Sequence, residues 1–102
     1  MKGQAMTVTG ILKDASSTIT TGGTPQSALA ANPGRKYLLI QNPSTASEVL
    51  WVNLTGTAVV DTQGSVSIEA GGALVFENGF EPSNAVSVIA ATTGHKFTIW
   101  WA

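Results

Sequence analysis

The sequence predicts an all-β domain: a single antiparallel β-sandwich of about seven to nine short strands, jelly-roll-like or Ig-like, with a small barrel as the alternative. Short apolar segments in period-2 alternation recur roughly every 8–12 residues. Turn residues such as Gly, Pro and Asn separate these segments. No helical apolar pattern continues for about ten residues before Gly, Pro or a β-branched run interrupts it. A chain of 102 residues accommodates one such domain.

The N-terminal part of the chain is polar, and its sequence pattern predicts little regular secondary structure. We divide the chain into a polar, partly extended arm with a first strand, residues 1–24, and a sandwich core, residues 25–102. Alternation predicts the first strand at residues 6–12 and a short strand at residues 17–20 inside a polar loop. Residues 26–31 are compatible with a weak strand or a single helical turn, ended by Asn-Pro-Gly.

Two central strands are predicted at residues 34–42 (GRKYLLIQN) and 49–54 (VLWVNL). In the first, Leu38 and Ile40 point to one face while Leu39 points to the other. Each strand is therefore apolar on both faces. Such strands are central, or they lie where core covers one face and a partner covers the other.

Two β-hairpins are predicted in the second half of the chain. Residues 65–69 and 73–77 alternate cleanly around a Gly-Gly turn, which indicates the first hairpin. Residues 85–91 and 96–102 indicate the second, with Gly94 in the left-handed conformation that the turn requires.

Two loops connect these segments. Residues 55–64 form a loop rich in Gly, Thr and Gln, with a possible short strand at Val59 and Val60. Residues 78–84 are rich in turn residues, and we expect Phe80 to close one end of the core.

The composition excludes several classes of function. Charged residues make up 11% of the chain, against roughly 25% in ordinary soluble domains. Such a surface suggests coverage by other subunits, so we expect a homo-oligomer, a dimer or trimer. The net charge of −1 and the scattered cations argue against nucleic-acid binding. No apolar run approaches the ~18 residues of a membrane span, and the start lacks a signal-peptide pattern, so we expect synthesis in the cytoplasm.

No residue pattern predicts catalysis, a cofactor or a metal. The single histidine, His95, lies at a predicted hairpin tip and is expected to be exposed there. One histidine, no cysteine and six dispersed acids do not assemble the ligands of a metal site. The Gly pairs lack the Lys and the helix of a phosphate loop. We therefore expect a non-enzymatic protein with no small-molecule ligand.

The tryptophans are the most informative side chains. Trp100 and Trp101 are adjacent in one strand, so their rings leave on opposite faces, and Trp101 on the core side places Trp100 outside. Trp51 likewise opposes the core-facing side of its strand. An outer tryptophan is covered by a loop of the same chain, by another chain, or by a sugar ring. Our candidates for a protein interface are Trp100, Trp51, Arg35, Tyr37 and Ile19, together with the 1–24 arm.

Four segments carry a resemblance to a known group: GRKYLLIQN, LWVN, SIEAGGALVFE and AVSVIAATTGHKFTIW. In these segments, which span roughly residues 34 to 100, the chain resembles small β-sandwich virion proteins of tailed bacteriophages. That group includes capsid decoration (cement) proteins and head-fibre or tail accessory proteins. The shared features are a grammar of strands and turns without reactive residues, so no family site is transferred.

The resemblance implies a structural protein repeated over a virion, with the major capsid protein or another virion component as partner. Our leading hypothesis is a decoration protein that bridges capsid subunits on the surface of the assembled head. The alternatives are a head-fibre, tail or baseplate component and, from another class, a carbohydrate-binding module.

Overall fold

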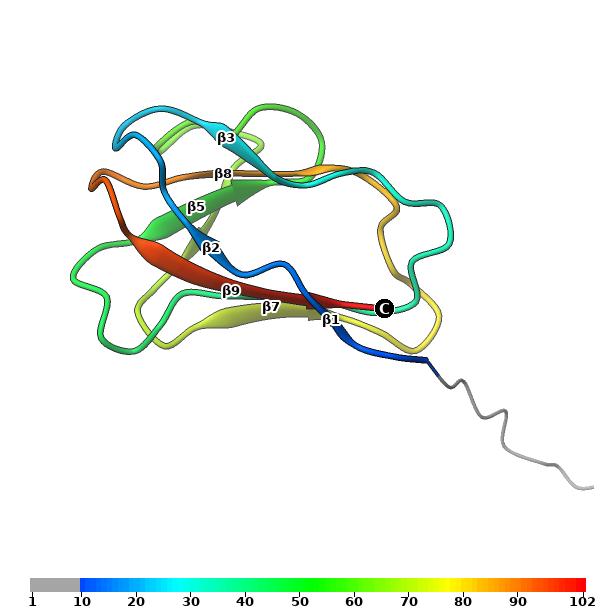
Figure 1. The fold of residues 1–102 in the computed structure, drawn as a ribbon. Coiled ribbons are helices and arrows are strands. Elements are labelled where there is room, and N and C mark those ends of the chain that lie inside the picture. The colour runs from blue at the N-terminus through cyan, green and yellow to red at the C-terminus, as the bar shows by residue number, and fades with distance from the viewer. Residues whose placement is uncertain (1–9) are drawn as a thin grey trace, which may run out of the picture.

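The computed structural model describes residues 10–102, which form nine strands in two antiparallel sheets packed face to face (Figure 1). One sheet has the order β1-β9-β4-β7, with β2 also paired to β9. Its strands are β1 (Lys13–Asp14), β2 (Ser17–Thr18), β4 (Leu38–Gln41), β7 (Ala73–Phe76) and β9 (Lys96–Trp101). The other sheet has the order β3-β8-β5-β6. Its strands are β3 (Gln26–Leu29), β5 (Leu50–Asn53), β6 (Val66–Ile68) and β8 (Val86–Ile89).

The connections follow the jelly-roll pattern. Among the described strands, β5 and β6 are the only chain neighbours that also pair with each other. From β2 onward, every other connection crosses from one sheet to the other. Two interleaved four-strand orders of this kind define a jelly roll. The predicted all-β sandwich is therefore confirmed. Of the jelly-roll-like and Ig-like topologies, the strand order is that of the jelly roll.

The core lies between the two sheets and consists of alternate residues of each strand. β-branched and aromatic residues suit such strands because they fill the space above a pleated, half-buried surface. The inward positions are almost fully buried: Leu38, Ile40, Phe97 and Ile99 from one sheet, and Leu50, Val52, Val86 and Val88 from the other. Trp101 packs against this core while Trp100 remains exposed, as predicted.

Neither predicted hairpin exists. The turn between β6 and β7 forms, with Gly72 N–H donating to Glu69 O, but β6 pairs with β5 while β7 pairs with β4. The turn between β8 and β9 also forms, with Gly94 at φ 87°, yet these strands belong to different sheets. Both turns are corners that carry the chain from one sheet to the other. The two strands that flank each turn belong to different sheets and contribute their core-facing residues from opposite sides of the core.

The N-terminal division also needs correction. Of the strand predicted at 6–12, residues 6–9 lie outside the described residues, and residues 10–12 are not in a strand. The chain instead joins the sheet at β1 and β2, which both pair with β9, and Ile19 is 1% exposed in the core. Residues 13–19 therefore belong to the sandwich itself. Residues 26–29 form a strand, β3, and the helical-turn alternative is wrong.

Phe80 does not close the core. Phe80 is 71% exposed, and its ring forms an edge-to-face pair with the ring of Phe76, with the ring centroids 6.4 Å apart. The Asn-Gly pair before it takes positive φ angles at both residues, as a tight turn requires.

Candidate functional site

The outer face of the five-stranded sheet carries an apolar row that runs across three strands. Leu39 of β4 pairs with Trp100 of β9 on one side and with Val75 of β7 on the other. Because neighbouring residues in a strand face opposite ways, the burial of Leu38, Ile40 and Ile99 directs these three side chains outward. Trp100 is 44% exposed and Val75 47% exposed. We call Trp100, Leu39 and Val75 the outer row.

The outer face of the four-stranded sheet is different, because the chain covers part of it. The loop between β5 and β6 folds back so that the Ala58 N–H donates to Ser87 Oγ at 2.9 Å, and Ala58 is fully buried. Asn53 beneath this loop is 7% exposed and donates from Nδ2 to Thr57 O at 3.2 Å. Trp51 is half-buried on this sheet. Within residues 10–102, the open apolar sheet face is therefore the one that carries the outer row.

The five predicted interface residues separate into two groups. Trp100 is exposed, while Tyr37 and Trp51 are half-buried. Ile19 and Arg35 are 1% and 5% exposed, so neither presents a side chain to a partner. Both were misplaced because each lies in a polar stretch whose contacts are made by residues far away in the sequence.

Arg35 is a buried cation that carbonyl groups surround. Its guanidinium donates to Pro82 O at 2.6 Å, to Asn84 O at 2.9 Å and to Ala30 O at 2.9 Å. Burial lowers the pKa of Arg35 from its ordinary value. The side chain joins the segment after β3 to the segment before β8, which is a structural task at one end of the sandwich.

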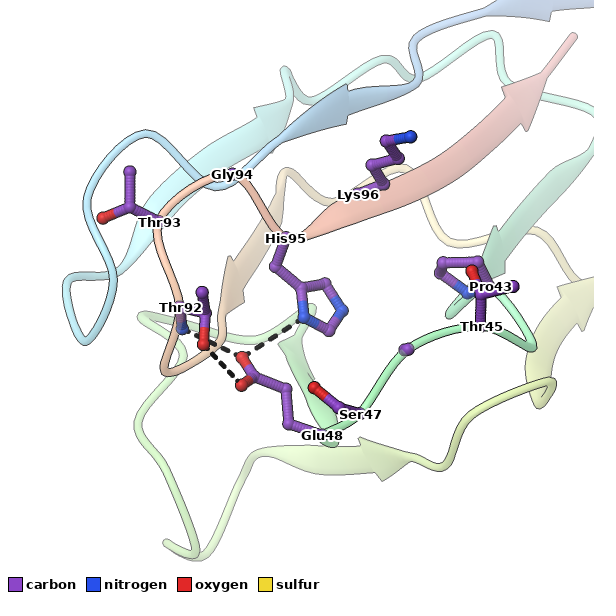
Figure 2. A pocket seen from close by; sticks show the side chains of 10 residues that line it. Pro43, Thr45, Ser47, Glu48, Thr92, Thr93, Gly94, His95 and Lys96 are labelled. Carbon is purple, nitrogen blue, oxygen red and sulfur yellow. Dashed lines mark hydrogen bonds and ion pairs between the residues drawn. The ribbon is translucent and has the colours of Figure 1, made fainter.

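A polar cluster lies at the opposite end of β4, where the sequence predicted an exposed histidine (Figure 2). The His95 side chain is 5% exposed, so that prediction is wrong. Its Nδ1 lies 3.2 Å from Glu48 Oε2, and its Nε2 lies 2.7 Å from Asn42 Oδ1. Glu48 also accepts from the Thr92 N–H at 2.9 Å and from Thr92 Oγ1 at 2.7 Å. These hydrogen bonds, Thr92 first and the nearby His95 after it, lower the pKa of Glu48.

The cluster is arranged to hold two loops together. Asn42 is fully buried, and its Nδ2 donates to Glu48 O and Ile68 O, both at 2.9 Å, so its Oδ1 must accept from His95. Both ring nitrogens of His95 are therefore engaged by side chains of the protein itself. The cluster therefore fastens the β4–β5 loop to the β8–β9 turn.

Two shallow depressions accompany these features. One, of about 260 Å³, lies beside the His95 cluster, and its lining includes Pro43, Glu48, Thr92 and His95 (Figure 2). The other, of about 270 Å³, lies beside β3 and β8 and is lined by residues such as Pro25, Gly56 and Ser87. Within the described range, no three His, Asp or Glu side chains gather as metal ligands would. No helix long and apolar enough to cross a membrane occurs in that range either.

The sequence held a partial signal for these sites. Alternation in β4 and β7 already placed Leu39 and Val75 opposite the core residues, but not in one row. A lone Asn after an apolar strand is a weak sign of a buried amide, and nothing local joins it to His95. Comparison with protein-family models, curated proteins and solved structures found no match to this chain.

Proposed function

We propose that this protein is a non-enzymatic structural protein of a bacteriophage virion, in the first place a decoration protein that binds the outside of the assembled capsid. Its partners would be the major capsid protein or another virion protein and further copies of itself. The observation that carries the proposal is the open outer row on one sheet, which suits adhesion between proteins.

Three further features support this proposal. Viral capsid proteins are among the proteins that use the jelly roll, although lectins and cupins use it too, so the fold supports the proposal by analogy alone. Only 11% of the residues are charged. The one histidine cluster has its hydrogen-bonding groups occupied by the protein itself. The resemblance of residues 34–100 to phage virion proteins agrees with all three.

The experiment is a binding assay with assembled, empty capsids. We expect the purified protein to co-sediment with the particles and to saturate at a fixed number of copies per capsid subunit. Immunolabelled electron microscopy of virions then separates a decoration protein on the head from a head-fibre, tail or baseplate component. The proposal would be contradicted if this protein could not be detected in purified virions of the phage that encodes it.

A carbohydrate-binding module is the second candidate, because Trp100 offers an open indole on a sheet face and sugar rings stack on such surfaces. The neighbours of Trp100 in the outer row, Leu39 and Val75, are aliphatic and offer no hydrogen bonds to hydroxyl groups. That composition favours a protein partner. Saturable binding in a glycan screen, lost in Trp100→Ala, would favour the sugar instead.

A further inference from the structure

We propose that a second copy of this chain docks on the outer face of the five-stranded sheet, with the outer rows of the two copies packed together. The two copies would be related by a twofold axis. This axis lies in the plane between the two facing five-stranded sheets, one from each copy, and runs perpendicular to their strands. This inference deepens the proposed function and rests on it for the expectation of self-association.

The first argument is the unequal treatment of the two sheet faces. The chain folds its own β5–β6 loop over part of the four-stranded sheet and buries Ala58 and Asn53 there. The outer row receives no such cover within the described residues, and it includes the ring of Trp100. Tryptophan is enriched among the residues that dominate the binding energy of protein interfaces. Two aligned β-sheets pack face to face through side chains of this kind.

The second argument is the distribution of charge along the outer face. Lys96 begins β9 and shares its outward side with Trp100, because the two are four residues apart. Asp14 pairs with Trp100 at the other end of the strand, roughly 13 Å from Lys96 at about 3.3 Å per residue. Glu77 directly follows β7 at that same end, where Phe76 pairs with Leu38 and Leu38 with Trp101. The face is therefore positive at one end and negative at the other.

Two further cations, Lys13 and Lys36, lie near the Asp14 end of this sheet. Lys13 pairs with Trp101 on the inward side, and its Nζ lies 4.7 Å from the centre of the Trp101 ring. Lys36 precedes β4 and is exposed, and alternation continued back from Leu38 places it on the side away from Leu39. Asp14 accepts a hydrogen bond from the Ser16 N–H at 2.9 Å. The Ser16 hydroxyl first, and this N–H after it, lower the pKa of Asp14.

These charges select one orientation of the pair. A twofold axis perpendicular to the strands reverses the second copy, so the Lys96 end of each protomer lies over the Asp14 end of the other. An axis parallel to the strands would instead place like charges together. Such rim pairs contribute little affinity, but they fix the register and disfavour the wrong arrangement. The apolar outer row supplies the attraction and the charged ends supply the direction.

The test is the oligomeric state of matched variants, measured by sedimentation velocity over a wide range of protein concentrations. Val75→Glu places a charge in the outer row and is expected to weaken dimerisation about tenfold or more. Val60→Glu is the control, because Val60 is similarly exposed, at 46%, but lies in the β5–β6 loop that folds over the four-stranded sheet. It should leave the dimer unchanged. Circular dichroism checks that both variants fold.

Charge reversal tests the orientation. Asp14→Lys and Lys96→Asp should each weaken the dimer, and the double variant should restore it, because each new lysine then faces a new aspartate. Restoration cannot occur about the parallel axis, where the reversed charges would again meet their own kind. The proposal would be overturned by a wild-type protein that stays monomeric at every concentration, or by equal effects of the two valine variants on dimerisation. A double charge-reversal variant that does not regain dimerisation would also overturn it.

The capsid assay keeps this outcome separate from the proposed function. A protein that dimerises but does not bind capsids would contradict the decoration role. The outer row would still be the self-association surface. A monomer that binds capsids, and loses that binding in Val75→Glu, would assign the outer row to a virion protein and overturn the second copy as its occupant.

Discussion

At the scale of single residues, Arg35 shows how a buried charge is retained without an acidic partner. The guanidinium is held by Pro82 O, Asn84 O and Ala30 O, which come from two segments far apart in the sequence. A planar fork of donors suits three carbonyls at once, whereas an ammonium group does not. The contact therefore determines how the chain enters β8 and leaves β3.

Replacing Arg35 should destabilise the protein strongly. Arg35→Ala leaves carbonyls without a partner in a buried site, and we expect a loss of about 2–4 kcal/mol in the free energy of unfolding. Arg35→Lys should lose a substantial part of this, because it cannot form the same fork of hydrogen bonds. Urea unfolding measures both, with the exposed neighbour Lys36→Ala as the control. If Arg35→Ala were as stable as the control, the carbonyl contacts would not matter to folding.

The Glu48 contacts should make stability depend on pH. The pKa of Glu48 is lowered in the folded state, chiefly by Thr92 and then by His95, so its ionised form stabilises the fold. This contribution is fully present above its ordinary value of 4.5 and is lost as the pH falls through the lowered folded pKa. We expect the wild type to be more stable than Glu48→Gln at pH 6, and the difference to shrink below about pH 4.5.

Urea unfolding of both proteins between pH 3 and about pH 7 measures that difference. Glu69→Gln is the matched control, since Glu69 is exposed and has no side-chain hydrogen bond in the described structure. A gap between wild type and Glu48→Gln that stays constant across the acid range would refute the role given to the Glu48 carboxylate.

At the scale of elements, the segment between β2 and β3 runs directly along the β8–β9 turn. The Gly23 N–H donates to Ala90 O at 2.8 Å, and the Gly94 N–H donates to Ile19 O at 2.7 Å. A Cβ on Gly22 would collide with Ala91 O and lie 2.8 Å from Thr93 N. This backbone contact requires glycine, because the atoms that a side chain would meet cannot rotate away.

Gly22→Ala should therefore cost more than Gly94→Ala. The first forces two backbone segments apart and should cost about 3 kcal/mol. The second has open space around its Cβ and a φ of 87°, so it should cost only about 1–2 kcal/mol of backbone strain. Hydrogen exchange provides the distinguishing readout: the Gly23 amide should lose protection in Gly22→Ala and keep it in Gly94→Ala. The reverse order would show that the contact relaxes easily.

Strands and turns could be predicted from the sequence because both depend on local chemistry. Alternation located β4, β5 and β9, and Gly94 took the left-handed conformation that was expected. The pairing could not be predicted, since a Gly turn suits a hairpin and a corner between sheets equally well. The chain forms corners at these turns because β7 and β9 each pair with β4, a strand that is distant from both in the sequence.

The candidate site follows the same division. The outward position of Trp100 was predictable, because its neighbour Trp101 had to face the core. The burial of His95 was not, since Glu48 lies 47 residues away and Asn42 lies 53 residues away. Arg35 was misassigned for the same reason, as two of its carbonyl partners come from the segment before β8.

At the scale of the whole molecule, the two sheets have unequal outer surfaces. The four-stranded sheet is partly covered by the β5–β6 loop, and the five-stranded sheet leaves the outer row open. A small domain buries only part of its chain surface and is marginally stable alone. Covering the outer row with a second copy would therefore add to folding stability as well as to assembly.

This coupling predicts that the stability of the wild type depends on protein concentration. If the dimer is the folded form, each tenfold increase in concentration adds about 1.4 kcal/mol per mole of dimer, and the urea midpoint rises accordingly. Val75→Glu should show a midpoint that is independent of concentration, while Val60→Glu should keep the concentration dependence of the wild type. Because apolar surface is buried on association, the dependence should persist in high salt, where the charged ends are screened. A midpoint that does not move with wild-type concentration would separate folding from self-association.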